Sequence, residues 1–126
     1  IATLSEDLRL RSMASQDQTL RIWTEPGSAV AKAGKKFTVT IYAEAGSEVQ
    51  LIPQLEFSFL EVQNMRIVPN TISYDKPFGG RVILGEAEVT IEKPGTWELV
   101  IPSDSVFSRL PDLQVITQGT KITALE

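Results

Sequence analysis

The sequence predicts an all-β protein, a sandwich of about eight or nine short antiparallel strands. Apolar and polar residues alternate from Thr19 onward, and turn-forming residues separate the alternating runs. No long run with helical periodicity interrupts them, which argues against a parallel α/β fold. A length of 126 residues without repeats or linkers predicts one domain with its own core.

An N-terminal lead-in, residues 1–18, precedes the sandwich domain, which we place at residues 19–126. Thr3–Glu6 fits a capping box, in which the threonine hydroxyl and the glutamate satisfy free amides at a helix start. Leu8–Arg11 alternates like a strand instead, so a helix and an extended chain stay open as alternatives. The chain begins at Ile1 without a Met, a basic region or a long apolar run, so we expect a cut or processed product that carries no signal peptide.

The clearest strand spans residues 36–43 and lies between glycines that supply turns. Its apolar side, which we expect to face the core, consists of Phe37, Val39, Ile41 and Ala43. A weaker alternation over residues 19–24 turns Trp23 outward, and Pro26-Gly27 ends that strand.

The middle of the chain contains a change in the parity of its apolar residues. They alternate up to Phe59, and then Leu60 and Val62 occupy the opposite positions. A one-residue shift turns the buried face of a strand outward, so we expect a β-bulge or a strand that switches sheets near Leu60. Two short strands, 65–68 and 71–74, flank a turn at Pro69-Asn70.

The C-terminal part of the chain predicts two hairpins. The inward residues of the strand at 81–92 are Ala87, Val89 and Ile91. The tight connection at 93–96 leads from this strand into an antiparallel neighbour at 97–101. An irregular segment with one helical turn follows. The strands at 113–117 and 120–125 then form the second hairpin, around Gln118-Gly119.

The residue types that the chain lacks exclude several chemistries. It has no Cys and no His, and therefore no disulfide, thiolate nucleophile, cysteine metal site or histidine base. A net charge of −4 with scattered cations gives no pull toward nucleic acid. No apolar run reaches the roughly 20 residues of a membrane-spanning helix. We predict no cofactor, no nucleic-acid partner and no transmembrane segment.

Carboxylates and serines are the remaining candidates for catalysis or metal binding. Glu86, Glu88 and Glu92 share one strand face, but that face lies opposite the core, so we expect solvated charge there and not an acid–base pair. The acidic residues in loops are too dispersed for a calcium loop. Ser105 and Ser108 lack the sequence context that activates a serine. We predict no catalytic residue and no metal site, and we expect that the chain is not an enzyme.

The loop that follows residue 74 is the candidate partner-binding segment. It combines aromatic and cationic side chains with a Gly pair, and Tyr and Arg are over-represented among the residues that dominate binding energy at interfaces. The residues that we single out are Tyr74, Lys76, Phe78 and Arg81. In the alternative interpretation, Phe78 folds back as a lid over one end of the sandwich.

A second candidate surface consists of outward aromatic side chains. Trp23, Tyr42 and Tyr74 fall on outward strand faces or in loops, where their rings can stack on sugars. A carbohydrate-binding module therefore stays open as the alternative to a protein-binding domain.

Two short motifs resemble those of known domains. Gly34–Ile41 resembles the glycine-led alternating strand of bacterial immunoglobulin-like domains and of cohesin modules. Pro94–Leu99 is similar to the Pro-Gly-Thr-Trp hairpin of extracytoplasmic immunoglobulin-like domains. Cohesins usually carry Tyr-Asp shortly before Leu-Glu-Val, whereas here Leu60–Val62 precedes Tyr74-Asp75. The resemblance implies an immunoglobulin-like, cohesin-like sandwich of bacterial or archaeal origin, and it does not imply dockerin binding.

The strand pattern, the absent residue types and this resemblance together predict a non-enzymatic domain of the cell envelope or cell surface. We expect it to lie outside the cytoplasm, in the periplasm or on the cell surface. There it would mediate protein–protein contact, adhesion or assembly of a larger structure with a protein partner.

Overall fold

The computed structural model describes residues 19–46, 49, 51–108 and 113–126, and the N-terminal lead-in lies outside the described residues. Eleven strands and one short 3-10 helix make up the described chain. The strands are β1 (Thr19–Glu25), β2 (Ser28–Lys32), β3 (Lys36–Ala45), β4 (Leu55–Ser58), β5 (Met65–Val68), β6 (Thr71–Tyr74), β7 (Arg81–Ile91), β8 (Gly95–Glu98), β9 (Phe107–Ser108), β10 (Gln114–Gln118) and β11 (Lys121–Leu125). The 3-10 helix η1 (Ser103–Ser105) is the helical turn predicted between β8 and β10.

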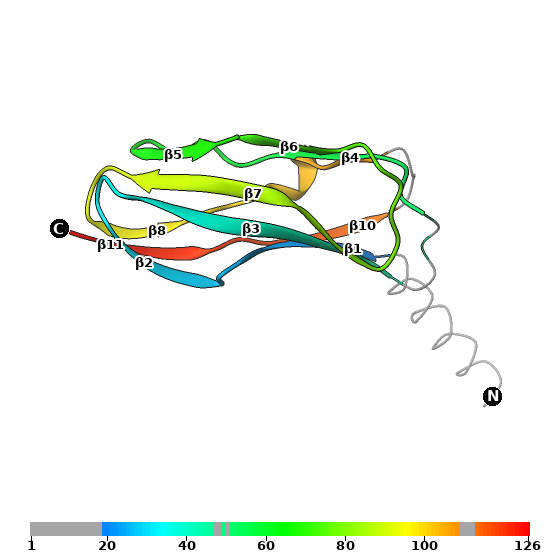
Figure 1. Cartoon of the computed structure of the whole chain (residues 1–126), viewed down its shortest axis with the longest axis horizontal. Helices are drawn as coiled ribbons and strands as arrows, with labels where there is room; N and C mark the ends of the chain where they lie inside the picture. The colour runs from blue at the N-terminus through cyan, green and yellow to red at the C-terminus, as the bar shows by residue number, and fades with distance from the viewer. Residues whose placement is uncertain (1–18, 47–48, 50, 109–112) are drawn as a thin grey trace, which may run out of the picture.

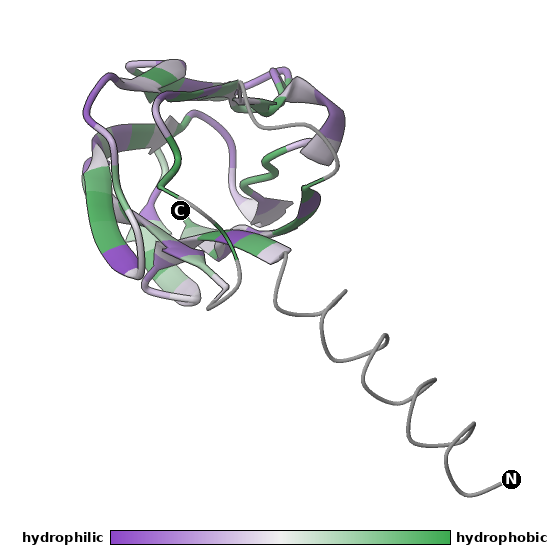
Figure 2. Cartoon of the chain, turned by 90° about the vertical axis from the view of Figure 1, so that its right-hand side faces the viewer, coloured by the Kyte–Doolittle hydropathy of each residue, from purple (hydrophilic) through white to green (hydrophobic). Residues whose placement is uncertain are grey.

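The strands form an immunoglobulin-like sandwich, as predicted. One sheet has five strands in the order β10-β1-β3-β7-β5, and the other layer consists of two three-stranded sheets, β2-β11-β8 and β6-β4-β9. Seen from one end, the strands surround a shared interior (Figure 2). Apolar side chains from all three sheets fill this interior, among them Leu20, Ile22, Val39, Ile41, Phe57, Ile72, Val89, Leu99 and Ile122. The period-two pattern of the sequence therefore predicted the buried faces of β1, β3 and the second half of β7 correctly.

The two predicted hairpins are wrong. β7 pairs with β3 and β5, whereas β8 pairs with β11, so the turn at 93–96 carries the chain from one sheet to the other. β10 and β11 do not pair with each other either: β10 lies parallel to β1, and β11 lies parallel to β2. Turn residues predict that a strand ends, but the next strand pairs with whichever neighbour lets it bury its apolar face.

Two chain segments cross together from the five-stranded sheet to the other layer. β1 continues into β2, and β10 continues beside it into β11 (Figure 1). The buried Thr120 hydroxyl donates to the Pro26 carbonyl over 2.7 Å. Since that donation uses its only proton, the Thr24 hydroxyl is the donor in the 2.6 Å bond between the two threonines. These bonds tie the two crossing segments together in the interior.

A register shift occurs in β7 and not near Leu60. Ile41 pairs with Gly85, but the next residue of β3, Tyr42, pairs with Ile83, so Leu84 is the extra residue of a β-bulge. At Leu60 the chain changes its neighbour instead: the Phe59 amide donates to Asn70, and the Leu60 amide donates to Val100. The bulge in β7 decides which side chains this strand presents on the outer face of the five-stranded sheet.

Candidate interaction surface on the five-stranded sheet

The four residues predicted to bind a partner do not form one exposed surface. Phe78 is only 4% exposed, and its backbone exchanges two hydrogen bonds with Ile52. Its ring meets the half-buried ring of Tyr74 edge to face, with centroids 5.5 Å apart. Lys76 is exposed in the loop. The structure therefore agrees with the alternative in which Phe78 folds back as a lid.

Arg81 lies instead on the outer face of the five-stranded sheet, where the strand register aligns two rows of side chains. Each row crosses β10, β1, β3 and β7 in that order. One row consists of Gln118, Trp23, Tyr42 and Ile83, and the other of Ile116, Arg21, Glu44 and Arg81. We call these eight residues the sheet patch.

Trp23 is the centre of the sheet patch. Its ring stacks on Tyr42 at a centroid distance of 5.6 Å and an interplanar angle of 11°. The Arg81 guanidinium lies over the Trp23 ring, 5.5 Å from its centroid, in the geometry of a cation–π contact. Arg81 also approaches Glu44 to 3.9 Å, and the Trp23 indole donates to Glu25 over 3.2 Å. These contacts hold the aromatic and cationic groups in one arrangement.

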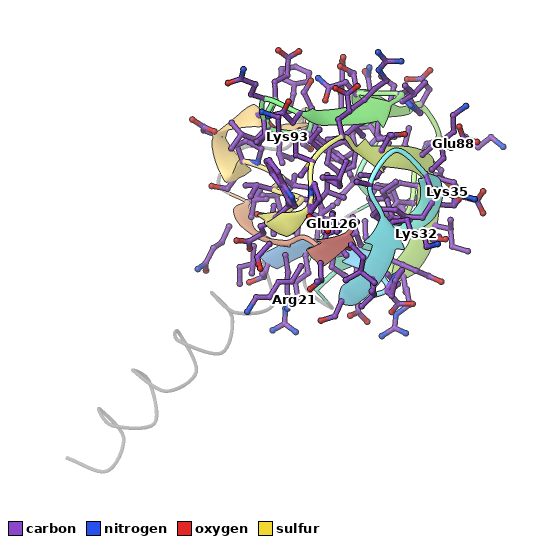
Figure 3. The ribbon with its side chains drawn as sticks, turned by 90° about the vertical axis from the view of Figure 1, so that its left-hand side faces the viewer. Arg21, Lys32, Lys35, Glu88, Lys93 and Glu126 are labelled. Carbon is purple, nitrogen blue, oxygen red and sulfur yellow. The ribbon has the colours of Figure 1, made fainter. Side chains whose placement is uncertain are left out.

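A hollow of about 300 Å³ opens beside Trp23. It is lined by Arg21, Ile22, Trp23, Glu44, Arg81, Ile116, Thr117 and Gln118. Arg21 projects away from the body of the sandwich at this face (Figure 3). Two guanidinium groups and one carboxylate line the hollow, so its charge is opposite in sign to the −4 of the whole chain.

The β-bulge in β7 places Arg81 in this patch. Along the second half of β7 the odd-numbered residues Ala87, Val89 and Ile91 are buried. On the N-terminal side of the bulge the alternation of buried and exposed residues is reversed. Leu84, an even-numbered residue, is buried there, whereas Arg81 and Ile83 are exposed. Sequence reasoning placed Trp23 and Tyr42 outward, but it grouped Arg81, the first residue of the strand at 81–92, with the preceding loop. The signal for the bulge is Gly85 inside an apolar strand.

The carboxylates and the serine considered as candidates for catalysis or metal binding make ordinary surface and backbone contacts. Glu86, Glu88 and Glu92 are exposed, and Glu88 lies 3.9 Å from Lys36. The Ser105 hydroxyl shares its one proton between the carbonyls of Ser58 and Pro102, at 3.0 and 2.7 Å. Within the described part of the chain, no three acidic side chains gather where they could hold a metal ion. The same residues include no helix long and apolar enough to span a membrane.

Comparison with known proteins identifies the fold. No family model and no curated protein matches the chain. Among solved structures, it is similar to the third ScaB cohesin of R. flavefaciens, in complex with a group 1 dockerin, with a TM-score of 0.63 and 12% identity over 85% of this chain and 95% of that one. The fold is that of the cohesins.

Two further cohesins agree with this result. The seventh ScaB type I cohesin of Pseudobacteroides cellulosolvens gives a TM-score of 0.55 at 12% identity, over 84% of this chain and 92% of that one. The third ScaC cohesin of Acetivibrio cellulolyticus, in complex with the ScaB dockerin, gives 0.54 at 12% identity, over 86% and 100%. The cohesin-like sandwich that the sequence motifs implied is therefore confirmed at the level of the fold.

Proposed function

We propose that this chain is a non-enzymatic binding domain that holds a protein partner on its sheet patch. The observation that carries the proposal is the joining of Trp23, Tyr42 and Arg81 on one accessible sheet face. Trp, Tyr and Arg are the residues most enriched where single side chains dominate the energy of a protein interface. An interface of this kind needs such anchors near its centre, surrounded by groups that exclude water.

The borders of the sheet patch supply apolar surface. Ile83 and Ile116 are exposed at opposite ends of the two rows. Together with the aromatic pair they form an apolar band across four strands, which a partner would remove from water. This surface suits a protein better than a small ligand, because the hollow beside Trp23 is open to solvent, whereas ligand pockets bury most of the ligand.

The charges of the sheet patch indicate the chemistry of the partner. Arg21 and Arg81 line the hollow together with one carboxylate, Glu44. A carboxylate on the partner, placed next to an apolar side chain, would satisfy a guanidinium that points to solvent in the free domain. We infer that the partner presents an acidic residue within a mostly apolar contact.

The comparisons support a role in assembly. Two of the cohesins that share the fold were solved in complex with a dockerin, a protein module. By analogy, we place this domain outside the cytoplasm, where it would join its partner to a larger structure at the cell surface. Carbohydrate binding loses its support, because Trp23 and Tyr42 cover one face of each other's ring and Tyr74 packs against Phe78.

An affinity experiment tests the proposal. The immobilised domain should capture a defined protein from the extracytoplasmic fraction of the source organism. Trp23→Ala should weaken binding of that protein by about 30-fold or more, as expected for the loss of ~2 kcal/mol at a hot spot. Phe107→Ala, at an exposed residue of the three-stranded sheet β6-β4-β9, is the control and should bind normally. Equal capture by Trp23→Ala would refute the sheet patch as the binding site.

A further inference from the structure

The outer edge of β2 carries backbone groups that face away from its neighbour. β2 stands at the edge of the sheet β2-β11-β8 and lies parallel to β11. At one end the Lys121 amide donates to the Gly27 carbonyl, and at the other the Ala33 amide donates to the Leu125 carbonyl. Because a parallel ladder uses every second residue, Ala29 and Ala31 also bond to β11. The amides and carbonyls of Ser28, Val30 and Lys32 then point outward.

This edge is open at its centre. Val30 is 69% exposed, and Ser28 and Lys32 are exposed on either side of it. In Figure 1, β2 lies along the lower side of the sandwich, with β11 above it. The Lys32 carbonyl accepts a 3.1 Å bond from Lys35 and keeps a second lone pair. Natural proteins protect edge strands with Pro and Lys. Here such residues lie only at the ends of β2, and none lies at Val30.

We propose that β2 pairs antiparallel with β2 of a second copy of this chain, around a two-fold axis at Val30. In this register Val30 meets Val30 of the second copy, and each exchanges its free amide and carbonyl with the other. Ser28 of each copy lies opposite Lys32 of the other. The pairing would join the two β2-β11-β8 sheets into one continuous sheet.

The two-fold register at Val30 uses the whole of β2 and is compatible with its side chains. A two-fold axis at Val30 pairs all five residues of the strand and aligns outward-facing backbone groups on both sides. It sets the single charge of β2, Lys32, opposite a small polar residue and thus avoids the like-charge contact that destabilises strand pairs. An axis at Lys32 would bring the two ammonium groups together. An axis at Ser28 would leave most of the strand unpaired.

Sedimentation velocity over a concentration series provides the first test. A single strand pair buries less than the roughly 1,600 Å² of a standard interface, so we expect a dissociation constant on the order of 100 μM. Val30→Lys places two lysines opposite each other and should weaken the dimer about tenfold or more. Val68→Lys is the matched control, because Val68 is a 56% exposed valine on another edge strand, β5, and this change should leave association as it is.

Disulfide trapping provides the second test. The chain has no Cys, so an oxidised Val30→Cys chain can cross-link only to another copy. Opposed residues in a hydrogen-bonded antiparallel pair have Cα atoms about 5.5 Å apart, within the range of a disulfide. We expect Val30→Cys to form dimers much faster than Val68→Cys.

Three outcomes would overturn the proposal. One is a chain that stays monomeric up to about 1 mM, ten times the expected dissociation constant. Another is a dimer that survives Val30→Lys, which would place the interface elsewhere. The third is protection of the Ser28, Val30 and Lys32 amides from hydrogen exchange only after a different protein is added, since the edge would then receive a foreign strand. The first outcome has no bearing on the sheet patch, which lies on a different sheet and is tested separately with Trp23→Ala.

Discussion

Trp23 is held in place before any partner arrives. Tyr42 stacks on its ring, Arg81 lies over it, and Glu25 accepts the indole hydrogen bond. An anchor that is already ordered loses less conformational entropy on binding, so more of its contact energy appears as affinity. The outward positions of Trp23 and Tyr42 followed from the period-two pattern. The position of Arg81 could not be predicted from that pattern, because it depends on one extra residue in β7.

Single core residues should dominate the stability of this domain. Phe57 is 1% exposed and packs edge to face on Phe59, whereas Phe107 is 57% exposed. Phe57→Ala leaves a cavity in the core and should lower the free energy of unfolding by about 3–5 kcal/mol. Phe107→Ala, the same chemical change at an exposed site, should stay within about 0.5 kcal/mol. Urea unfolding measures both, and equal losses would contradict the core described here.

The threonine pair at the crossing of the sheets should behave as a unit. Thr120→Val removes the donor to Pro26 and the acceptor for Thr24, which leaves the buried Thr24 hydroxyl unsatisfied at a cost of about 1–3 kcal/mol. Adding Thr24→Val removes that unsatisfied hydroxyl. The double variant should therefore lose less stability than the sum of the two single variants. Strict additivity in a double-mutant cycle measured by thermal unfolding would show that the two hydroxyls act independently.

At the scale of elements, strands were easier to predict than their pairing. Alternation and turn residues are local, and they gave the strands at 36–45, 65–68 and 71–74 closely. Pairing depends on contacts between residues far apart in the chain. Nothing near Gln118-Gly119 indicates that the chain continues into another sheet instead of reversing. The burial of Thr120, whose hydroxyl bonds to the other crossing segment, becomes evident only in the structure.

The crossing from β10 to β11 should tolerate only glycine at position 119. A Cβ on Gly119 would overlap the carbonyl oxygen of Leu99. Leu99 is held in this position because its amide donates a hydrogen bond to the Thr120 carbonyl. Gly119→Ala must push this backbone away, and we expect a loss of at least ~2 kcal/mol, as for other changes that strain a packed backbone. Gly27→Ala, at the crossing from β1 to β2, meets no atom within 4 Å and should be neutral or slightly stabilising. A thermal unfolding series in which both variants behave alike would contradict this packing.

At the scale of the whole molecule, the domain combines a cohesin fold with an aromatic and cationic patch on its five-stranded sheet. The sequence predicted the fold class and the shared core, because these depend on hydrophobic periodicity. From composition it predicted a partner-binding segment in the loop after Tyr74, whereas we propose the sheet patch. Only the strand register shows that Trp23, Tyr42 and Arg81 lie side by side. The sheet patch and the loop after Tyr74 give opposite expectations for which tyrosine contacts the partner. Tyr42 lies in the patch and Tyr74 precedes the loop, and both are half-buried.

Photo-cross-linking at these tyrosines tests the central claim most directly. A photoreactive phenylalanine derivative would replace either Tyr42, in the sheet patch, or Tyr74, beside the Phe78 lid. Each variant would be irradiated with the extracytoplasmic fraction of the source organism, after circular dichroism has shown that it folds. We predict that position 42 cross-links to one defined protein and that position 74 does not. A cross-link at position 74 with none at position 42 would contradict the account and return the site to the loop.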